Sequence, residues 1–212
     1  MGGVPTSATH RAIEEALRLA RVLAALSPDE PEAHSLAALL EIQASRAAAR
    51  VGPAGEPVLL LDQNRARWDR LLIGRGLAAL ALGGGRGVYA LQAAVAACHG
   101  RALTAAATDW PRIAALYADL AEVAPAPVVE LNRAVADAMA FGPAACFALL
   151  DALACEPALA NYHLLPSVRG DLLVKLGRTA EARGEFVRAA GLTRNDRERR
   201  LLLDRADACG VG

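Results

Sequence analysis

The sequence GDLLVKLGRTAEARGEFVRAAGL, residues 170–192, decides the fold of this chain. Gly177 is followed by Ala182, Phe186 and Ala189 at spacings of five, four and three residues, and Gly170 precedes it. Where two antiparallel helices touch, small residues allow close approach, a glycine permits the turn and an aromatic ring fills the gap beside it. The spacing therefore predicts a helical hairpin that turns at Gly177.

A second glycine turn, at Gly142, precedes Gly177 by 35 residues. This interval is close to the period of about 34 residues in tetratricopeptide-type repeats. Stacked helical hairpins mostly form surfaces for other proteins and seldom carry chemistry of their own. We therefore expect an all-α protein of antiparallel helical hairpins in a tetratricopeptide-like right-handed stack, with a binding or regulatory role.

The composition agrees with a helical protein, since 54% of the 212 residues are apolar and only 4% are aromatic. The 23 basic and 23 acidic residues cancel, so net charge draws the molecule neither to nucleic acid nor to a membrane. No apolar stretch reaches the roughly 20 uncharged residues that span a bilayer. Four scattered cysteines without a CxxC pair favour reduced thiols, no metal site and a cytoplasmic location: Cys98, Cys146, Cys155 and Cys209.

Apolar periodicity and the positions of proline and glycine predict about ten helices. They cover residues 8–26, 29–50, 65–82, 87–99, 109–123, 128–140, 143–154, 158–176, 179–191 and 195–208. The longest break is the loop over residues 51–64, which is rich in glycine and proline. We expect a helical pair and loop over residues 1–64 and a helical repeat region over 65–212, joined as one continuous domain.

Three glycines lie inside predicted helices: Gly74, Gly76 and Gly170. Each costs about 1 kcal/mol relative to alanine in a helix. We expect close approach of a neighbouring helix to compensate, so these glycines are predicted to mark packing contacts.

Six segments of the sequence, taken in order, resemble segments of a known protein family. They are SPDEPEAHSLAALL from Ser27, LLLDQNRARWDRLLI from Leu59, YALQAAVAACH from Tyr89, TDWPRIAALY from Thr108, PVVELNRAVA from Pro127 and DLLVKLGRTAEARGEFVRAAGLTRNDRERRLL from Asp171. Together they resemble the C-terminal extension of one group of extracytoplasmic-function (ECF) RNA polymerase sigma factors. In that group a tetratricopeptide-like helical domain follows the sigma core. The resemblance runs from about Arg11 to Leu203.

The resemblance implies a non-catalytic domain that supports transcription initiation through contacts with the sigma core, RNA polymerase or a small partner protein. The regions with which such a factor opens and reads a promoter are not visible in these residues, so we expect no direct promoter reading by this chain. It is either an excised domain of a longer sigma factor or a truncated relative. The alternative is a free-standing tetratricopeptide-type adaptor that binds an unrelated peptide or protein. No catalytic, cofactor-binding or metal-binding residues are predicted.

The first candidates for partner contacts are polar residues around one tryptophan: Asp62, Gln63, Arg65, Arg67, Trp68 and Asp69. Arg65 and Asp69 are four residues apart, a spacing at which they would pair on a helix. Trp68 has the amphipathic ring that often anchors a partner peptide. The alternative is that Trp68 fills the core between hairpins.

Two further pairs of polar residues interrupt apolar helices and are candidates for a concave groove that takes a peptide. Gln92 and His99 are seven residues apart, hence on one helix face, and Asn132 and Arg133 form the other pair. For Asn132 a hydrogen bond to loop backbone is the competing interpretation.

The two ends of the chain carry weaker signals. Five arginines near the C-terminus alternate with acids, which favours a salt-bridged helix surface over nucleic-acid binding: Arg194, Arg197, Arg199, Arg200 and Arg205. If the chain is an excised domain, we expect an exposed apolar patch around Leu17, Val22 and Leu23, and a homodimer in isolation. The leader Met1-Gly2-Gly3-Val4 resembles the family poorly.

Overall fold

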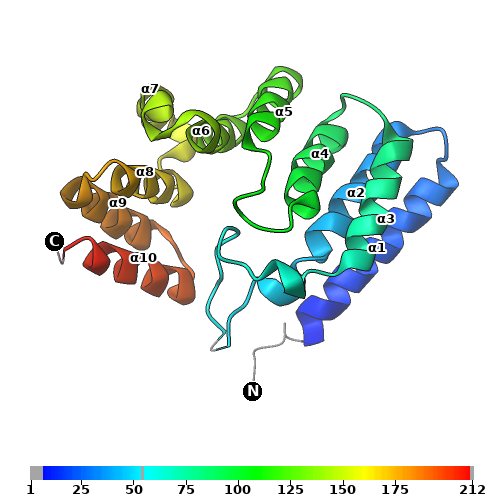
Figure 1. Cartoon of the computed structure of the whole chain (residues 1–212), viewed down its shortest axis with the longest axis horizontal. Coiled ribbons are helices and arrows are strands. Elements are labelled where there is room, and N and C mark those ends of the chain that lie inside the picture. Colours follow the sequence, from blue (N-terminus) through cyan, green and yellow to red (C-terminus); the bar gives the residue numbers. More distant parts are fainter. Residues whose placement is uncertain (1–6, 54, 211–212) are drawn as a thin grey trace. The chain divides into compact units, whose positions relative to one another are not determined.

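The computed structural model describes residues 7–53 and 55–210, and this part of the chain is all-helical (Figure 1). Its α-helices are α1 (Ser7–Leu26), α2 (Pro31–Ala44), α3 (Arg70–Gly83), α4 (Val88–Arg101), α5 (Trp110–Val123), α6 (Pro127–Phe141), α7 (Phe147–Ala154), α8 (Leu164–Lys175), α9 (Thr179–Leu192) and α10 (Asp196–Ala208). Short 3₁₀ helices are η1 (Ala47–Ala49), η2 (Arg65–Arg67), η3 (Pro143–Cys146) and η4 (Pro157–Leu159). The predicted all-α stack of about ten helices is confirmed. The leader Met1–Val4 lies outside the described residues.

The chain divides into two compact units between Val123 and Ala124. The first unit contains α1 to α5 and the second contains α6 to α10. The expected boundary at residue 64, drawn within one continuous domain, falls inside the first unit. In the structure α2 packs against α1, α3 and α4, so the residues before and after position 64 share one core.

In the first unit α2 is the central helix. Ile42 of α2 is 1% exposed and packs in one cluster with Ala96 and Ala97 of α4. A Cβ atom at Gly76 of α3 would lie 2.5 Å from Cγ1 of Ile42 and 3.0 Å from a backbone oxygen of α2. The predicted packing contact at Gly76 is therefore confirmed, because only a hydrogen fits between the two helices. At Gly74 a Cβ would meet nothing within 4 Å, so that part of the prediction is wrong.

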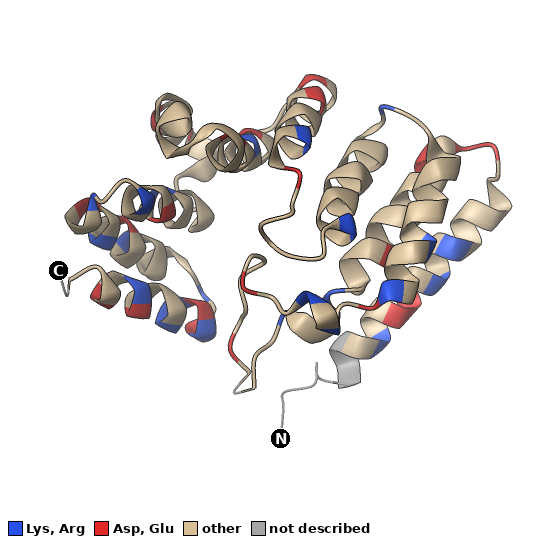
Figure 2. Cartoon of the chain, viewed as in Figure 1, with Lys and Arg blue, Asp and Glu red and all other residues tan. Residues whose placement is uncertain are grey.

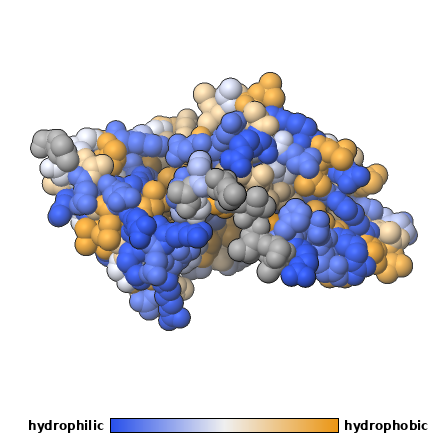
Figure 3. Space-filling view, turned by 90° about the horizontal axis from the view of Figure 1, so that it is seen from below, coloured by the Kyte–Doolittle hydropathy of each residue, from blue (hydrophilic) through white to orange (hydrophobic). Residues whose placement is uncertain are grey.

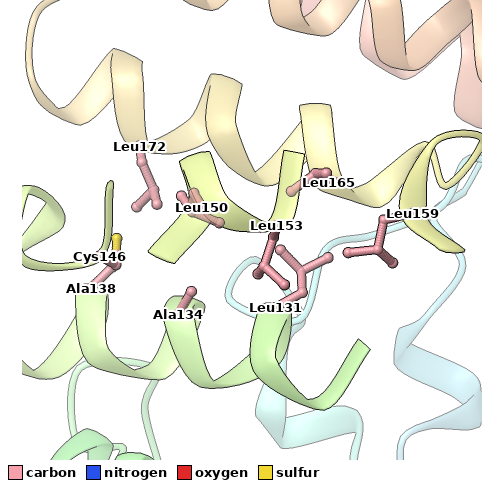
Figure 4. Packing of buried hydrophobic residues seen from close by; sticks show 9 residues of the cluster. All are labelled: Leu131, Ala134, Ala138, Cys146, Leu150, Leu153, Leu159, Leu165 and Leu172. Atoms are coloured by element: carbon pink, nitrogen blue, oxygen red, sulfur yellow. The ribbon is translucent and has the colours of Figure 1, made fainter. Parts of the chain in front are cut away.

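The second unit contains the predicted helical hairpin at Gly177. Gly177 has φ +73° and turns the chain between α8 and α9, which pack against each other. Ala182, Phe186 and Ala189 are buried in one cluster with Leu202 and Ala206 of α10. Gly170 of α8 lies against the Phe186 ring, as predicted. Figure 4 shows the neighbouring leucine-rich cluster, where side chains from α6, α7 and α8 converge.

Several predicted helices start or end differently in the structure. The helix expected over 65–82 is interrupted, because Trp68 is extended (φ −77°, ψ 134°) and the Asp69 carboxylate accepts hydrogen bonds from the Leu71 and Leu72 amides. Asp69 therefore caps α3, which begins at Arg70. The second predicted helix begins at Pro31, after its cap Glu30, and ends at Ala44 instead of residue 50. The helix expected from residue 158 begins only at Leu164, after η4.

Candidate functional site

Arg65 connects the loop before α3 to the end of α4. Its side chain is buried, and Nη1 donates hydrogen bonds to the carbonyl oxygens of His99 (2.8 Å) and Ala102 (2.9 Å). Its Nη2 donates to Oγ1 of Thr108 at 3.0 Å. The last carbonyls of a helix lack intrahelical partners, so Arg65 caps the C-terminus of α4 from a distant part of the chain. It forms no pair with Asp69, since the two side chains serve different helix ends.

Trp68 lies beside this network, in the core of the first unit. It is 3% exposed and packs with Ala49 and Ile73. The guanidinium carbon of Arg65 is 4.8 Å from the centre of the Trp68 ring, and that of Arg46 is 5.7 Å away. Both distances suit a cation–π contact. Trp68 thus fills the core and is not available to a partner in this conformation.

The other residues of this segment divide into buried and exposed. Gln63 is buried and donates from Nε2 to the carbonyl oxygen of Val58 at 3.1 Å. Asp69 is exposed but caps α3. Asp62 and Arg67 are exposed, and neither side chain forms a hydrogen bond or ion pair with another described residue. Of the six first candidates, Asp62 and Arg67 are therefore the ones open to a partner.

Gln92 and His99 share one face of α4, as predicted, and both line a cavity of about 170 Å³. We call it the α4 cavity. Its other lining residues come from α2, the turn after α2, the 51–64 loop, α4 and α5: Leu39, Gln43, Arg46, Leu60, Val95, Ala96 and Tyr117. The sequence did not single out Gln43, Arg46 or Tyr117, because their positions give no sign that they converge on α4.

His99 is a neutral imidazole at neutral pH. It is 8% exposed, and its ring meets the Trp110 ring edge-on with the centres 5.3 Å apart. Burial, followed by the charges of Arg46 and Arg65, lowers the pKa of His99 to about 4. Nδ1 is buried without a hydrogen-bond partner among the described residues. A base this weak is poorly suited to remove a proton at neutral pH.

Arg46 brings a positive charge to the α4 cavity. Burial, followed by the charges of Arg50 and Arg65, lowers the pKa of Arg46 to about 10, so the guanidinium stays charged at neutral pH. Arg46 donates one hydrogen bond, to Oε1 of Gln43, and Arg50 donates to the same oxygen at 2.7 Å. Within the described part of the chain none of these three arginines forms an ion pair. The cavity therefore lies in a region of uncompensated positive charge.

Residues 4–83 match the model of a family of unknown function (DUF6596). An uncharacterized protein of Rhizobium meliloti (strain 1021) is 45% identical over 197 residues, which are 90% of this chain and 46% of that protein. The chain therefore spans about half the length of this relative. No solved structure matches the chain. The family match includes Arg46, Arg65 and Trp68, but α4 and α5 lie beyond it.

Asn132 and Arg133 lie on α6, in the second unit. Asn132 is exposed, and Arg133 pairs with Glu130 of the same helix at 2.8 Å. The hydrogen bond to loop backbone considered for Asn132 is not among the contacts of the described residues. This pair is therefore a feature of α6 in the second unit.

The C-terminal arginines lie on a surface of mixed charge, as Figure 2 shows for α8 to α10. Arg199 pairs with Asp196 at 2.6 Å and donates to the carbonyl oxygen of Thr193 at 2.8 Å. Arg205 pairs with Asp171 of α8. These ion pairs agree with the salt-bridged helix surface that the sequence favoured.

Two general findings restrict the chemistry of the described residues. No group of three or more His, Cys, Asp or Glu side chains among residues 7–53 and 55–210 is placed to hold a metal ion. No helix in the described part is both long and apolar enough to cross a membrane.

Proposed function

We propose that this chain is a non-catalytic regulatory domain of an ECF RNA polymerase sigma factor. It would support transcription initiation through contacts with the sigma core, RNA polymerase or a small partner protein. The observation that carries the proposal is the comparison with the Rhizobium meliloti relative. The two chains are 45% identical over 197 residues, yet these residues are only 46% of the relative, so more than half of that protein is a further region. A helical extension joined to a sigma core would have this proportion.

The fold supports a protein-binding role. Helical hairpins packed in series expose long helix faces, which proteins of this architecture commonly use for binding. The segment from Leu59 that resembles sigma-factor extensions surrounds Trp68, and its buried members connect the loop to α3 and α4. Asp62 and Arg67 are among its exposed members, on the surface of the first unit. We therefore place the contact surface around these two residues.

A binding experiment with exposed charge reversals tests this proposal. The chain is immobilised and offered purified RNA polymerase and a separately expressed ECF sigma core, each alone. Arg67→Glu and Asp62→Lys change the proposed surface without touching the core. Arg200→Glu is the matched control, since Arg200 is exposed on α10 in the second unit. Trp68→Ala is unsuitable as a surface variant because Trp68 is 3% exposed.

Capture of the sigma core or polymerase, weakened by Arg67→Glu and not by Arg200→Glu, is the expected result. If Arg67→Glu and Arg200→Glu weakened capture equally, the contact surface would not lie around Asp62 and Arg67. Capture of neither protein would contradict the sigma-factor proposal. The alternative would then be a free-standing adaptor, which requires an identified peptide or protein that binds directly to the purified chain.

Homodimerisation in isolation is a second part of the proposal. Val22 and Leu23 on α1 are 42% and 45% exposed, as expected, whereas Leu17 is 8% exposed and belongs to the core. Leu19 and Leu26 of α1 are also exposed, at 53% and 78%, so the patch follows one face of α1 and excludes Leu17. On the face drawn in Figure 3, hydrophobic residues form separate patches between hydrophilic ones. Sedimentation of the wild type and of Val22→Glu tests the dimer, and a strict monomer over a wide concentration range would contradict it.

A further inference from the structure

The α4 cavity combines a positive charge with an absence of acids. None of its nine lining residues is Asp or Glu, and Arg46 lies in its wall. Arg65 adds a second charge next to the first, since it faces the same Trp68 ring. Like charges in a partly buried site repel one another and favour an anion that neutralises them. The site therefore has an electrostatic preference for a negatively charged group.

The cavity also contains hydrogen-bonding groups without protein partners. The side chains of Gln92, His99 and Tyr117 make no hydrogen bond to any described residue, and Arg46 uses only the bond to Gln43. His99 is 8% exposed, so its ring is nine-tenths buried. Buried polar side chains in native proteins nearly always have a partner, which is either protein, ordered water or a ligand. Nδ1 of His99 is such a buried group, and the half-buried side chains of Gln92 and Tyr117 line the same space, which favours an occupant with hydrogen-bonding groups.

Size and shape limit the occupant. The cavity volume is about 170 Å³, comparable to engineered protein cavities of about 150 Å³ that hold a benzene molecule. Apolar side chains form the rest of the wall, Leu39, Leu60 and Val95 among them. A ligand that fits would carry one small anionic head and a short hydrocarbon chain. A nucleotide or a phosphosugar is too large.

We propose that the α4 cavity binds a carboxylate on a short aliphatic chain. Its oxygens accept hydrogen bonds from Arg46 and from the Gln92 amide, and its methylene groups pack on the apolar wall. A planar guanidinium matches a carboxylate well, because two parallel N–H groups can donate to its two oxygens. This inference does not depend on the proposed sigma-factor role, since it concerns a site within the first unit.

Two sources can supply such a carboxylate, a free short-chain acid and the side chain of a glutamate in a partner. Butyrate is the probe for the first source. N-acetyl-glutamate amide is the probe for the second, because it presents the same carboxylate on a peptide backbone. Binding of butyrate alone assigns a small-molecule site, whereas binding of both assigns a site that a protein side chain can enter.

The experiment is a titration of the full 212-residue chain with each probe, monitored by two-dimensional ¹H–¹⁵N NMR. Butyrate is expected to cause saturable shifts at Gln92, His99 and Tyr117, with a dissociation constant in the millimolar range because so small a ligand makes few contacts. Butyramide has the same propyl chain without a charge, and butylamine carries a positive charge on a molecule with the same number of carbon atoms. Each is expected to bind at least about tenfold more weakly, since the charged hydrogen bonds are lost.

Two variants locate the site. Arg46→Gln removes the charge and is expected to weaken butyrate binding about tenfold or more. Gln92→Leu removes the unpartnered amide and keeps the side-chain size, so it serves if Arg46→Gln disturbs folding. Arg75→Gln is the control, because Arg75 is exposed on α3 and does not line the cavity. It is expected to leave binding unchanged.

Three outcomes would overturn the proposal. The first is the absence of saturable shifts with both carboxylate probes, which would mean that water fills the cavity. The second is equal binding of butyrate and butyramide, which would mean that the charge has no role. The third is inorganic phosphate binding at the same residues more tightly than butyrate, which would assign a different anion.

Discussion

Replacing Gly170 by alanine is expected to destabilise the second unit. In the middle of a helix this change normally stabilises a protein by about 0.5–1 kcal/mol. Here the new Cβ would lie 2.6, 2.8 and 2.9 Å from three carbon atoms of the Phe186 ring. Phe186 is 1% exposed, so the ring has little room to move. Overpacking of this kind typically costs about 1–3 kcal/mol, so the net loss centres on about 1 kcal/mol and reaches up to about 2.5 kcal/mol.

Gly184 offers a matched control on the facing helix. It lies within α9, and a Cβ there would meet no atom within 4 Å. Gly184→Ala is therefore expected to stabilise the chain by about 0.5–1 kcal/mol. The two variants make the same chemical change, so the opposite signs isolate the contact with Phe186. Phe186→Leu in the Gly170→Ala background is expected to cost less than in the wild type, because it relieves the overlap.

Urea denaturation, monitored by far-UV circular dichroism, measures these changes in the free energy of unfolding. Hydrogen exchange identifies the helices that are destabilised. Both tryptophans, Trp68 and Trp110, belong to the first unit, so tryptophan fluorescence is expected to change little in either variant. Faster exchange is expected in α8 and α9. The reasoning would be refuted if Gly170→Ala stabilised the chain as much as Gly184→Ala does.

Three further predictions concern the first unit. The Glu32 carboxylate caps α4, because it accepts hydrogen bonds from the Tyr89 and Ala90 amides at 2.8 and 3.0 Å. Glu32→Gln is therefore expected to lower the free energy of unfolding, measured by urea denaturation, by about 1 kcal/mol. An unchanged midpoint would contradict this cap. Arg65→Lys is expected to lower the free energy of unfolding by about 2 kcal/mol, since an ammonium cannot reach all three acceptors of the guanidinium. Tryptophan fluorescence measures this unfolding, and full stability in the lysine variant would show that the charge alone suffices. The His99 ring should titrate near pH 4 in an NMR experiment, because its folded pKa lies below the unfolded value of about 6.5. The contribution of neutral His99 to the free energy of unfolding is then complete above pH 6.5. It falls by up to about 3 kcal/mol as the pH drops towards 4, because protons bind the unfolded chain first. A titration near pH 6.5 would contradict this.

The candidate site was predicted only in part. The sequence predicted that Gln92 and His99 lie on one face of a helix, because a spacing of seven residues puts two side chains on the same face of any α-helix. Arg46 and Tyr117 were missed, since each lies on a different element and only the packing of α2 and α5 beside α4 brings them together. Trp68 and Arg65 were considered as surface contacts because local sequence does not distinguish an exposed tryptophan from a buried one.

The sequence by itself determined the helices and the hairpin at Gly177. These features depend on local properties: apolar periodicity, the turn that glycine permits and the breaks that proline imposes. Tertiary structure decided the rest. The division of the chain at Val123 and Ala124, the capping of α4 by Glu32 and Arg65, and the cavity at His99 all depend on contacts between residues far apart in sequence. Such contacts arise only when helices pack, because their distances are set by side-chain shape and not by spacing along the chain.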